Sequence, residues 1–173
     1  MRIGRKLKIK QIRKGIFETN SSSSHAVSVK HRDEMRVEFY LQPQEDGYIH
    51  IILDKFGWDY DGDLYGQERH LSYLLTLAAM SEDCTNYFDE QTNDWCRSRF
   101  EKTKIFKRIE ESVVKVAKKF DIDIEGIYID DFDGYIDHQS YYPPMEFLDT
   151  YGLSIKKFIF GSGINLIIDH DNH

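Results

Sequence analysis

The sequence contains few features of extracellular, membrane or zinc-binding proteins. Among its 173 residues are two cysteines, Cys84 and Cys96, and neither has a Cys or His partner at zinc-ligand spacing. We expect reduced thiols at both positions, with a disulfide as the alternative. No apolar run approaches the roughly 20 residues of a membrane helix, and no apolar stretch of signal-peptide type follows the basic N-terminus. These absences predict a cytoplasmic protein.

The common motifs for nucleotide binding, acyl transfer and calcium binding are also missing. Gly-rich phosphate loops of the Walker and dinucleotide kinds do not occur. Gly161-Ser162-Gly163 is half of a nucleophile elbow, so we predict a hairpin turn there. Asp59, Asp61 and Asp63 alternate as in a calcium loop, but leucine and histidine replace its essential glycine and glutamate. We therefore expect no cofactor. The acidic run 130–133 is expected to be a solvated turn, with a magnesium site as the alternative.

Positive charge is concentrated at the N-terminus. Residues 1–16 hold seven basic side chains and no acidic one, whereas the rest of the chain holds 16 basic and 30 acidic groups. A basic arm can contact phosphate, while an acidic body repels nucleic acid overall and suits a basic groove on a protein partner. Alternatively, the arm is an edge strand whose lysines guard against aggregation.

Hydrophobic periodicity predicts the secondary structure. Apolar residues at helical spacing predict a helix over 67–81 and a second helix that follows a capping box at 98–101. Pro143 and Pro144 predict a short third helix that ends near Gly152. Alternation of period two predicts strands, and turn residues at 43–47 predict that the two flanking strands form a hairpin. The expected strands are 6–10, 25–29, 37–41, 48–53 and 124–129, with a final hairpin of 158–160 and 164–168.

We therefore predict a basic arm or edge strand at 1–16 and a single α+β domain at 17–173. Its fold is expected to be a mainly antiparallel sheet with two substantial helices packed on it. Three polar clusters that each contain a histidine lie near strand ends of this domain, at 20–25, 137–140 and 169–172. Loops at strand ends commonly display reactive groups, so the three clusters are candidate parts of one site.

Histidine is the side chain best placed to donate and accept protons near neutral pH. We predict that His25 and His138 act as base and acid in the cleavage of a phosphodiester, with Asp171 orienting a histidine. RNA is the favoured substrate because its 2′-hydroxyl supplies the nucleophile, and this chemistry needs no metal. The structural alternatives are ordinary turns and a frayed C-terminus. The residues expected to bind substrate through hydroxyl, amide or basic groups are Asn20, Ser22, Ser23, Gln139, Ser140, Arg13 and Lys14.

The stretch Arg13-Lys14-Gly15-Ile16-Phe17, followed by Glu-Thr-Asn-Ser-Ser-Ser-Ser-His, resembles the opening of an uncharacterised family of phage and prophage-encoded proteins. The segments 70–78, 137–140 (Asp-His-Gln-Ser) and 158–172 are similar to that family's central helix, second motif and ending. Asp169-His170 departs from the family pattern, which has glycine before Asn-Asp-Asn. The resemblance spans most of the chain. It implies a small phage-type accessory protein in the host cytoplasm, of the kind that often acts against host defence.

Three classes of function fit that context. The first is the ribonuclease-like enzyme with His25 and His138. The second is a non-catalytic, anti-CRISPR-like inhibitor. Its acidic loops at 59–63 and 130–133, with the aromatic side chains of Trp58, Tyr60 and Phe132, would occupy a basic groove of a host nucleoprotein complex. The third is a virion or accessory protein without such a site.

Overall fold

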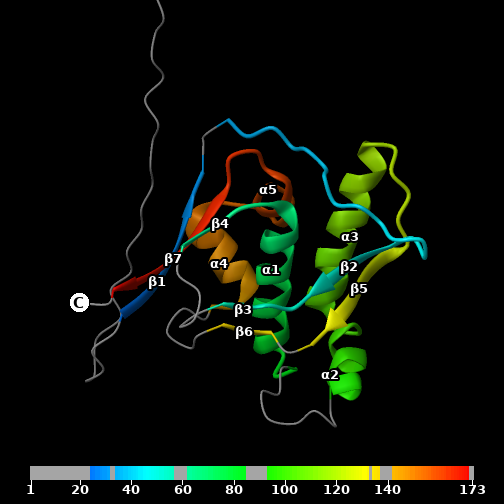
Figure 1. Ribbon diagram of the computed structural model, residues 1–173, viewed down its shortest axis with the longest axis horizontal. Helices are drawn as coiled ribbons and strands as arrows, with labels where there is room; N and C mark the ends of the chain where they lie inside the picture. Colours follow the sequence, from blue (N-terminus) through cyan, green and yellow to red (C-terminus); the bar gives the residue numbers. More distant parts are fainter. Residues whose placement is uncertain are drawn as a thin grey trace, which may run out of the picture.

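The computed structural model describes residues 24–31, 34–56, 62–84, 93–132, 134–136 and 142–171. Figure 1 shows helices and strands interspersed along the chain, so the α+β class is confirmed. In order, the elements are β1 Ser24–Lys30, β2 Tyr48–Ile52, β3 Lys55–Phe56, β4 Gly62–Leu64, α1 Gln67–Ser81, α2 Asn93–Phe100, α3 Lys104–Lys119, β5 Gly126–Asp131, β6 Tyr135–Ile136, α4 Pro144–Tyr151, α5 Ile155–Phe160 and β7 Asn165–Asp171.

The strands of the described residues form small sheets of two kinds. β1, β7 and β4 make an antiparallel sheet in that order, whereas β2 pairs with β5 and β3 pairs with β6 in parallel. The expectation of a mainly antiparallel sheet therefore describes the three-stranded sheet but not the two parallel pairs. The predicted strand at 6–10 and the basic arm at 1–16 lie outside the described residues.

The predicted hairpin of 37–41 with 48–53 is wrong. Residues 38–44 are irregular, and the Glu38 amide donates to the carbonyl oxygen of Phe160 at 3.0 Å. β2 instead pairs in parallel with β5, with Tyr48 opposite Gly126. Parallel strands need a long crossover connection, and the chain that contains α1, α2 and α3 supplies it.

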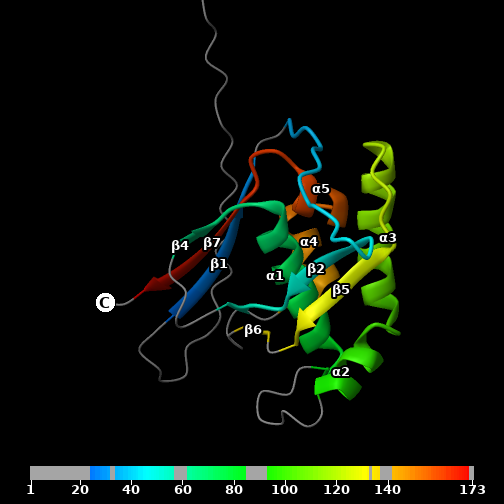
Figure 2. The ribbon, with the colours of Figure 1, turned by 45° about the vertical axis from the view of Figure 1, so that its right-hand side comes forward.

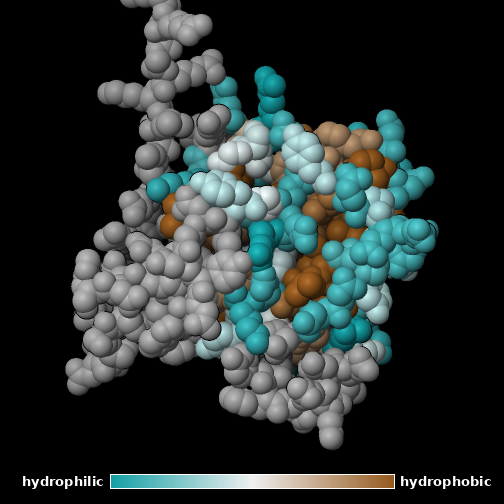
Figure 3. Space-filling model, in the orientation of Figure 1, coloured by the Kyte–Doolittle hydropathy of each residue, from teal (hydrophilic) through white to brown (hydrophobic). Residues whose placement is uncertain are grey.

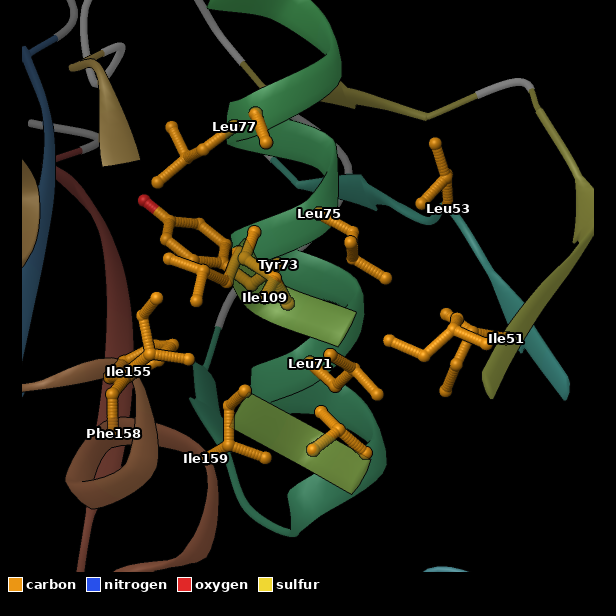
Figure 4. Packing of buried hydrophobic residues seen from close by; sticks show 14 of the residues in the cluster. Ile51, Leu53, Leu71, Tyr73, Leu75, Leu77, Ile109, Ile155, Phe158 and Ile159 are labelled. Carbon is orange, nitrogen blue, oxygen red and sulfur yellow. The ribbon is translucent and has the colours of Figure 1, made fainter. Parts of the chain in front are cut away.

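Helix α1 is the centre of the core and has the predicted bounds. Every residue from His70 to Ala79 is buried, because the helix is covered on all sides by other elements. Figure 4 shows Leu71, Leu75 and Leu77 of α1 among side chains from β2, α3 and α5. On its polar side, the Ser72 hydroxyl donates to the carbonyl oxygen of Ile52 at 2.6 Å and fixes the end of β2.

Helix α3 has the predicted buried face but a different N-terminus. Ile109, Val113 and Val116 are buried at helical spacing. The N-cap is Thr103, whose side chain accepts a hydrogen bond from the Phe106 amide at 3.3 Å. The capping box expected at 98–101 is therefore wrong, because these residues complete α2 and the turn that follows it.

The C-terminal region also departs from the prediction in one element. The short helix α4 was predicted and ends at Gly152, whose φ of 65° suits glycine. Residues 158–160, however, belong to helix α5, in which Ser154 caps the amide of Lys157 at 3.2 Å. The expected final hairpin is therefore wrong, and β7 pairs with β1 and β4 instead.

Candidate functional site

The first and third polar clusters meet in the backbone of one sheet. β1 and β7 are antiparallel, and their register places His25 opposite His170 and Ser24 opposite Asp171. Residues that lie directly opposite in an antiparallel pair share one face of the sheet. Figure 2 shows this end of β1 and β7 projecting beyond the helices. Two histidine positions separated by 145 residues in sequence are thus cross-strand neighbours.

The register also shows which positions along β1 and β7 share a row of the sheet. Alternate residues of a strand share a face, so position 25 lies in the same row as Val29, and position 170 in the same row as Leu166. Val29 and Leu166 lie opposite each other and are buried. Asp171 lies in the other row. The role of Asp171 in orienting a histidine stays a prediction.

The other predicted site residues lie outside the described residues: His138, Gln139, Ser140, Asn20, Ser22, Ser23, Arg13 and Lys14.

The described part of the chain limits how far the start of the 137–140 motif can lie from the β1–β7 sheet. The motif starts directly after Ile136 of β6, which pairs with Phe56 of β3. Six residue steps separate Phe56 from Gly62, which lies opposite Ile168 of β7. A chain of that length spans at most about 22 Å, so β3 and β6 end within that reach of the β1–β7 sheet.

A second histidine arrangement, absent from the sequence predictions, lies on the outer face of β2 and β5. Nδ1 of His50 is 2.7 Å from Oδ1 of Asp130, and Nε2 is 2.9 Å from Oδ2 of Asp46. The Tyr128 ring lies against the imidazole at a centroid distance of 4.9 Å. Arg97 of α2 approaches the other members, with its guanidinium carbon 5.9 Å from the Tyr128 centroid and a nitrogen 3.4 Å from the Asp130 carbonyl oxygen.

These contacts favour the charged forms of the histidine and one carboxylate. Hydrogen bonds to Asp46 and Asp130 raise the pKa of His50 above its ordinary 6.5. The Tyr48 amide donates to Oδ1 of Asp46 at 3.0 Å, and this bond, together with His50, lowers the Asp46 pKa below 3.8. Both ring nitrogens of His50 are therefore engaged by carboxylates, which differs from the free nitrogen expected of a catalytic base.

The sequence contains a weak signal for this arrangement. Asp46 lies in the predicted turn, and His50 lies at an outward-facing position of the strand that follows. Asp130 lies directly after the strand predicted at 124–129, in the acidic run that was expected to be a turn. The signal was missed because 48–53 was assigned to a hairpin with 37–41, which left β5 without a position beside it.

The acidic aromatic loops are only partly described. Phe132 is buried in the core, so its predicted place in a surface interface is wrong. Trp58 and Tyr60 lie outside the described residues, as does most of the 59–63 loop. In the part of the chain that the structure describes, no group of three or more His, Cys, Asp or Glu side chains could hold a metal ion.

The chain was compared with family models, curated proteins and solved structures, and none of them matches it. The resemblance to phage proteins therefore stays a prediction. Among the described helices, none has the length and apolar character required to cross a membrane. The two histidine arrangements are thus the features from which a function can be inferred.

Proposed function

We propose that the protein is a phage-type anti-defence enzyme that cleaves phosphodiester bonds in RNA, at the paired ends of β1 and β7. The register that places His25 opposite His170 carries this proposal. Acid–base cleavage needs a base and an acid near one phosphate, and two imidazoles can fill these roles. His138 is the second histidine expected from sequence, and the register adds His170 as the alternative second member of the pair.

The proposed reaction uses the 2′-hydroxyl of the substrate. One neutral imidazole removes the proton of this hydroxyl, and the 2′-oxygen forms a bond to phosphorus. The bond from phosphorus to the 5′-oxygen breaks, and the protonated second imidazole gives its proton to that oxygen. The products are a 2′,3′-cyclic phosphate and a free 5′-hydroxyl. Hydroxyls and amides of the 20–25 and 137–140 motifs would bind the charged phosphate oxygens.

The test is cleavage of an end-labelled RNA by purified protein in EDTA, with the all-deoxy strand beside it. We expect cleavage of RNA alone and a roughly 10²–10⁴-fold loss of rate in His25→Ala. A comparable loss in either His170→Ala or His138→Ala identifies the partner of His25. His50→Gln is the matched control and should retain the rate, because it removes a histidine from a different sheet. Wild-type turnover in His25→Ala would overturn the proposal.

The outer face of β2 and β5 favours one second candidate, the non-catalytic inhibitor. Ile52 and Tyr128 are 54% and 41% exposed, large values for such side chains on a sheet. Asp46 and Asp130 carry negative charge on the same face. Figure 3 shows hydrophobic surface bordered by hydrophilic residues near these strands. Aromatic and acidic groups together suit a basic groove of a host nucleoprotein complex.

The inhibitor proposal makes the opposite prediction for the two histidines. Inhibition of a purified nucleoprotein nuclease should be stoichiometric, should weaken with added salt and should survive His25→Ala. It should be reduced by Tyr128→Ala, which removes an exposed aromatic side chain. Inhibition that requires His25 and persists in Tyr128→Ala would contradict this second candidate.

A further inference from the structure

The turn before β2 is joined to the sheet by backbone hydrogen bonds and by His50. The Gln44 amide of the turn donates to the carbonyl oxygen of Tyr48 in β2 at 2.9 Å. Within the turn, the Gly47 amide donates to the Gln44 carbonyl oxygen at 2.9 Å, and the Gly47 carbonyl accepts from the Glu125 amide at 2.9 Å. The side chain of Asp46 adds the contact to His50. Residues of this turn line a shallow surface hollow of about 540 Å³, formed by Pro43, Gln44, Glu45 and Asp46.

We propose that His50 is a proton-operated clamp: its imidazolium fastens the 43–47 turn to the β2–β5 sheet, and loss of the proton releases the turn. The device is independent of the cleavage proposed for the β1–β7 strand ends. It stands on one ring that lies between two carboxylates from different elements, 2.7 and 2.9 Å away.

The chemistry of imidazole explains why the clamp needs its proton. The protonated ring donates from both nitrogens, and a carboxylate can only accept. A neutral ring has one N–H, so the second nitrogen would present a lone pair to a carboxylate oxygen. Both hydrogen bonds are therefore compatible with the imidazolium and only one with the neutral ring.

Of the two carboxylates, Asp46 of the turn is the one that loses its hydrogen bond to a neutral His50. Asp130 lies on β5, which is fixed by pairing with β2, and its contact to the ring is the shorter one. Asp46 lies on the turn, and beyond His50 its carboxylate accepts from the Tyr48 amide. The one remaining N–H of a neutral His50 should therefore stay on Asp130.

The charged and titratable surroundings come from three elements. Asp46 of the turn and Asp130 of β5 face the two ring nitrogens, Tyr128 of β5 lies against the ring, and Arg97 of α2 lies over Tyr128. The carboxylates outweigh the guanidinium because they contact the ring directly. This geometry agrees with the raised pKa of His50 and the lowered pKa of Asp46.

The signs of the two shifts define the pH window of the clamp. Because the folded pKa of His50 is raised, its contribution is complete below pH 6.5 and is lost as the pH rises through the raised value. Because the folded pKa of Asp46 is lowered, its contribution is present above pH 3.8 and is lost as the pH falls through the lowered value. The clamp is therefore closed in mildly acidic solution and opens on the alkaline side.

NMR titration and amide hydrogen exchange of the full chain test the clamp. We expect the His50 ring to titrate with a midpoint above 6.5, and each unit of excess corresponds to a tenfold stronger hold on the proton. Above that midpoint, protection of the Gly47 and Tyr48 amides should fall after correction for intrinsic exchange. In Asp46→Asn, the His50 midpoint should move down and the pH response of the turn should disappear.

The control is His31→Gln, which removes a histidine whose ring contacts the Tyr151 carbonyl oxygen, on another part of the molecule. This variant should keep the wild-type pH response of the turn. His50→Gln should leave the turn weakly protected at every pH. A His50 midpoint at or below 6.5, or turn protection that is independent of pH in the wild-type protein, would overturn the proposal whatever the RNA assay shows.

Discussion

His50 on β2 and His25 on β1 lie in two sheets that use histidine differently. His50 has a carboxylate at each ring nitrogen, one from Asp130 of β5 and one from Asp46 of the turn before β2. His25 lies opposite a second histidine, His170, in a row of the antiparallel sheet whose neighbouring carboxylate, Asp171, falls in the other row. In the first arrangement, the carboxylates of Asp46 and Asp130 surround the His50 ring. In the second, two histidine positions lie opposite each other on paired strands.

This difference in surroundings distinguishes a histidine suited to a structural role from one that is a candidate for catalysis. A ring whose two nitrogens are hydrogen-bonded to carboxylates cannot accept a substrate proton without first losing a contact. Two histidine positions that lie opposite each other on paired strands are the arrangement from which a base and an acid are proposed. The number of histidines in a sequence therefore says little about catalysis. The pairing of strands decides which histidines are candidates for proton transfer.

The test with the largest expected effect concerns the register of β1 with β7, on which the His25–His170 pair depends. We predict that a Val27→Cys/Ile168→Cys variant forms a disulfide on mild oxidation, because these positions are directly opposite and lie in the same row as the histidines. The bond should stabilise the protein by about 2–4 kcal/mol. Peptide mass spectrometry identifies the bond, and thermal unfolding measures the gain.

A Val27→Cys/Ile167→Cys variant is the matched control. A slip of one residue would reverse the faces of β7 and would favour this second bond. Cross-linking of the control at the same rate as the first pair would show that the register is not fixed, and the proposed histidine pair would lose its basis. Cys84 and Cys96 are buried free thiols and should not interfere.

The second test concerns Gly134, which directly precedes β6. A Cβ atom there would lie 2.6 Å from Cβ of Leu53 and 2.9 Å from the hydroxyl of Thr76. Gly134→Ala should therefore destabilise the protein by about 1–3 kcal/mol through overpacking, as measured by urea unfolding. It should also reduce RNA cleavage if the 137–140 motif takes part, while the His50 titration remains unchanged.

Gly152→Asn serves as the control for Gly134→Ala. A Cβ atom at Gly152 would meet no neighbouring atom within 4 Å, and asparagine tolerates the positive φ of this position. This variant should unfold close to the wild-type midpoint. Equal losses in the two variants would indicate that crowding at Gly134 is not the cause.

The sequence predicted elements well where a long periodic pattern was present. The buried stripe at 67–81 defined α1, and Pro144 with Gly152 defined α4. Short apolar runs were assigned less well: 158–160 was predicted as a strand of a final hairpin, but it belongs to α5, which Ser154 caps. The parallel pairing of β2 with β5 could not be inferred, because alternation identifies faces of a strand but not its partner.

The same limit applies to the sites. The clusters at 20–25, 137–140 and 169–172 were candidate parts of one site, and the register of β1 with β7 places position 25 opposite position 170. The choice of His138 over His170 followed from a motif, which contains no information about pairing. The His50 arrangement depends on Asp130, 80 residues away, so it became visible only with the β2–β5 pair.

The smallest expected effect belongs to Tyr73, which lies in the core between the two regions. Its ring packs on Phe56 and Phe147 at centroid distances of 5.1 and 5.3 Å, and Figure 4 shows its hydroxyl pointing away from α1. Within the described chain that hydroxyl is fully buried without a hydrogen-bond partner, and burial raises its pKa. Tyr73→Phe keeps the ring and removes the unpaired group, so unfolding should show a gain of less than about 1 kcal/mol.

Tyr151→Phe is the comparison for Tyr73→Phe, because the Tyr151 hydroxyl has a hydrogen bond with the backbone of Val29 in β1. This variant should lose about 0.5–1.5 kcal/mol, the usual value of one hydrogen bond, and should loosen the sheet that carries His25. A loss of similar size in Tyr73→Phe would mean that its hydroxyl is hydrogen-bonded in solution.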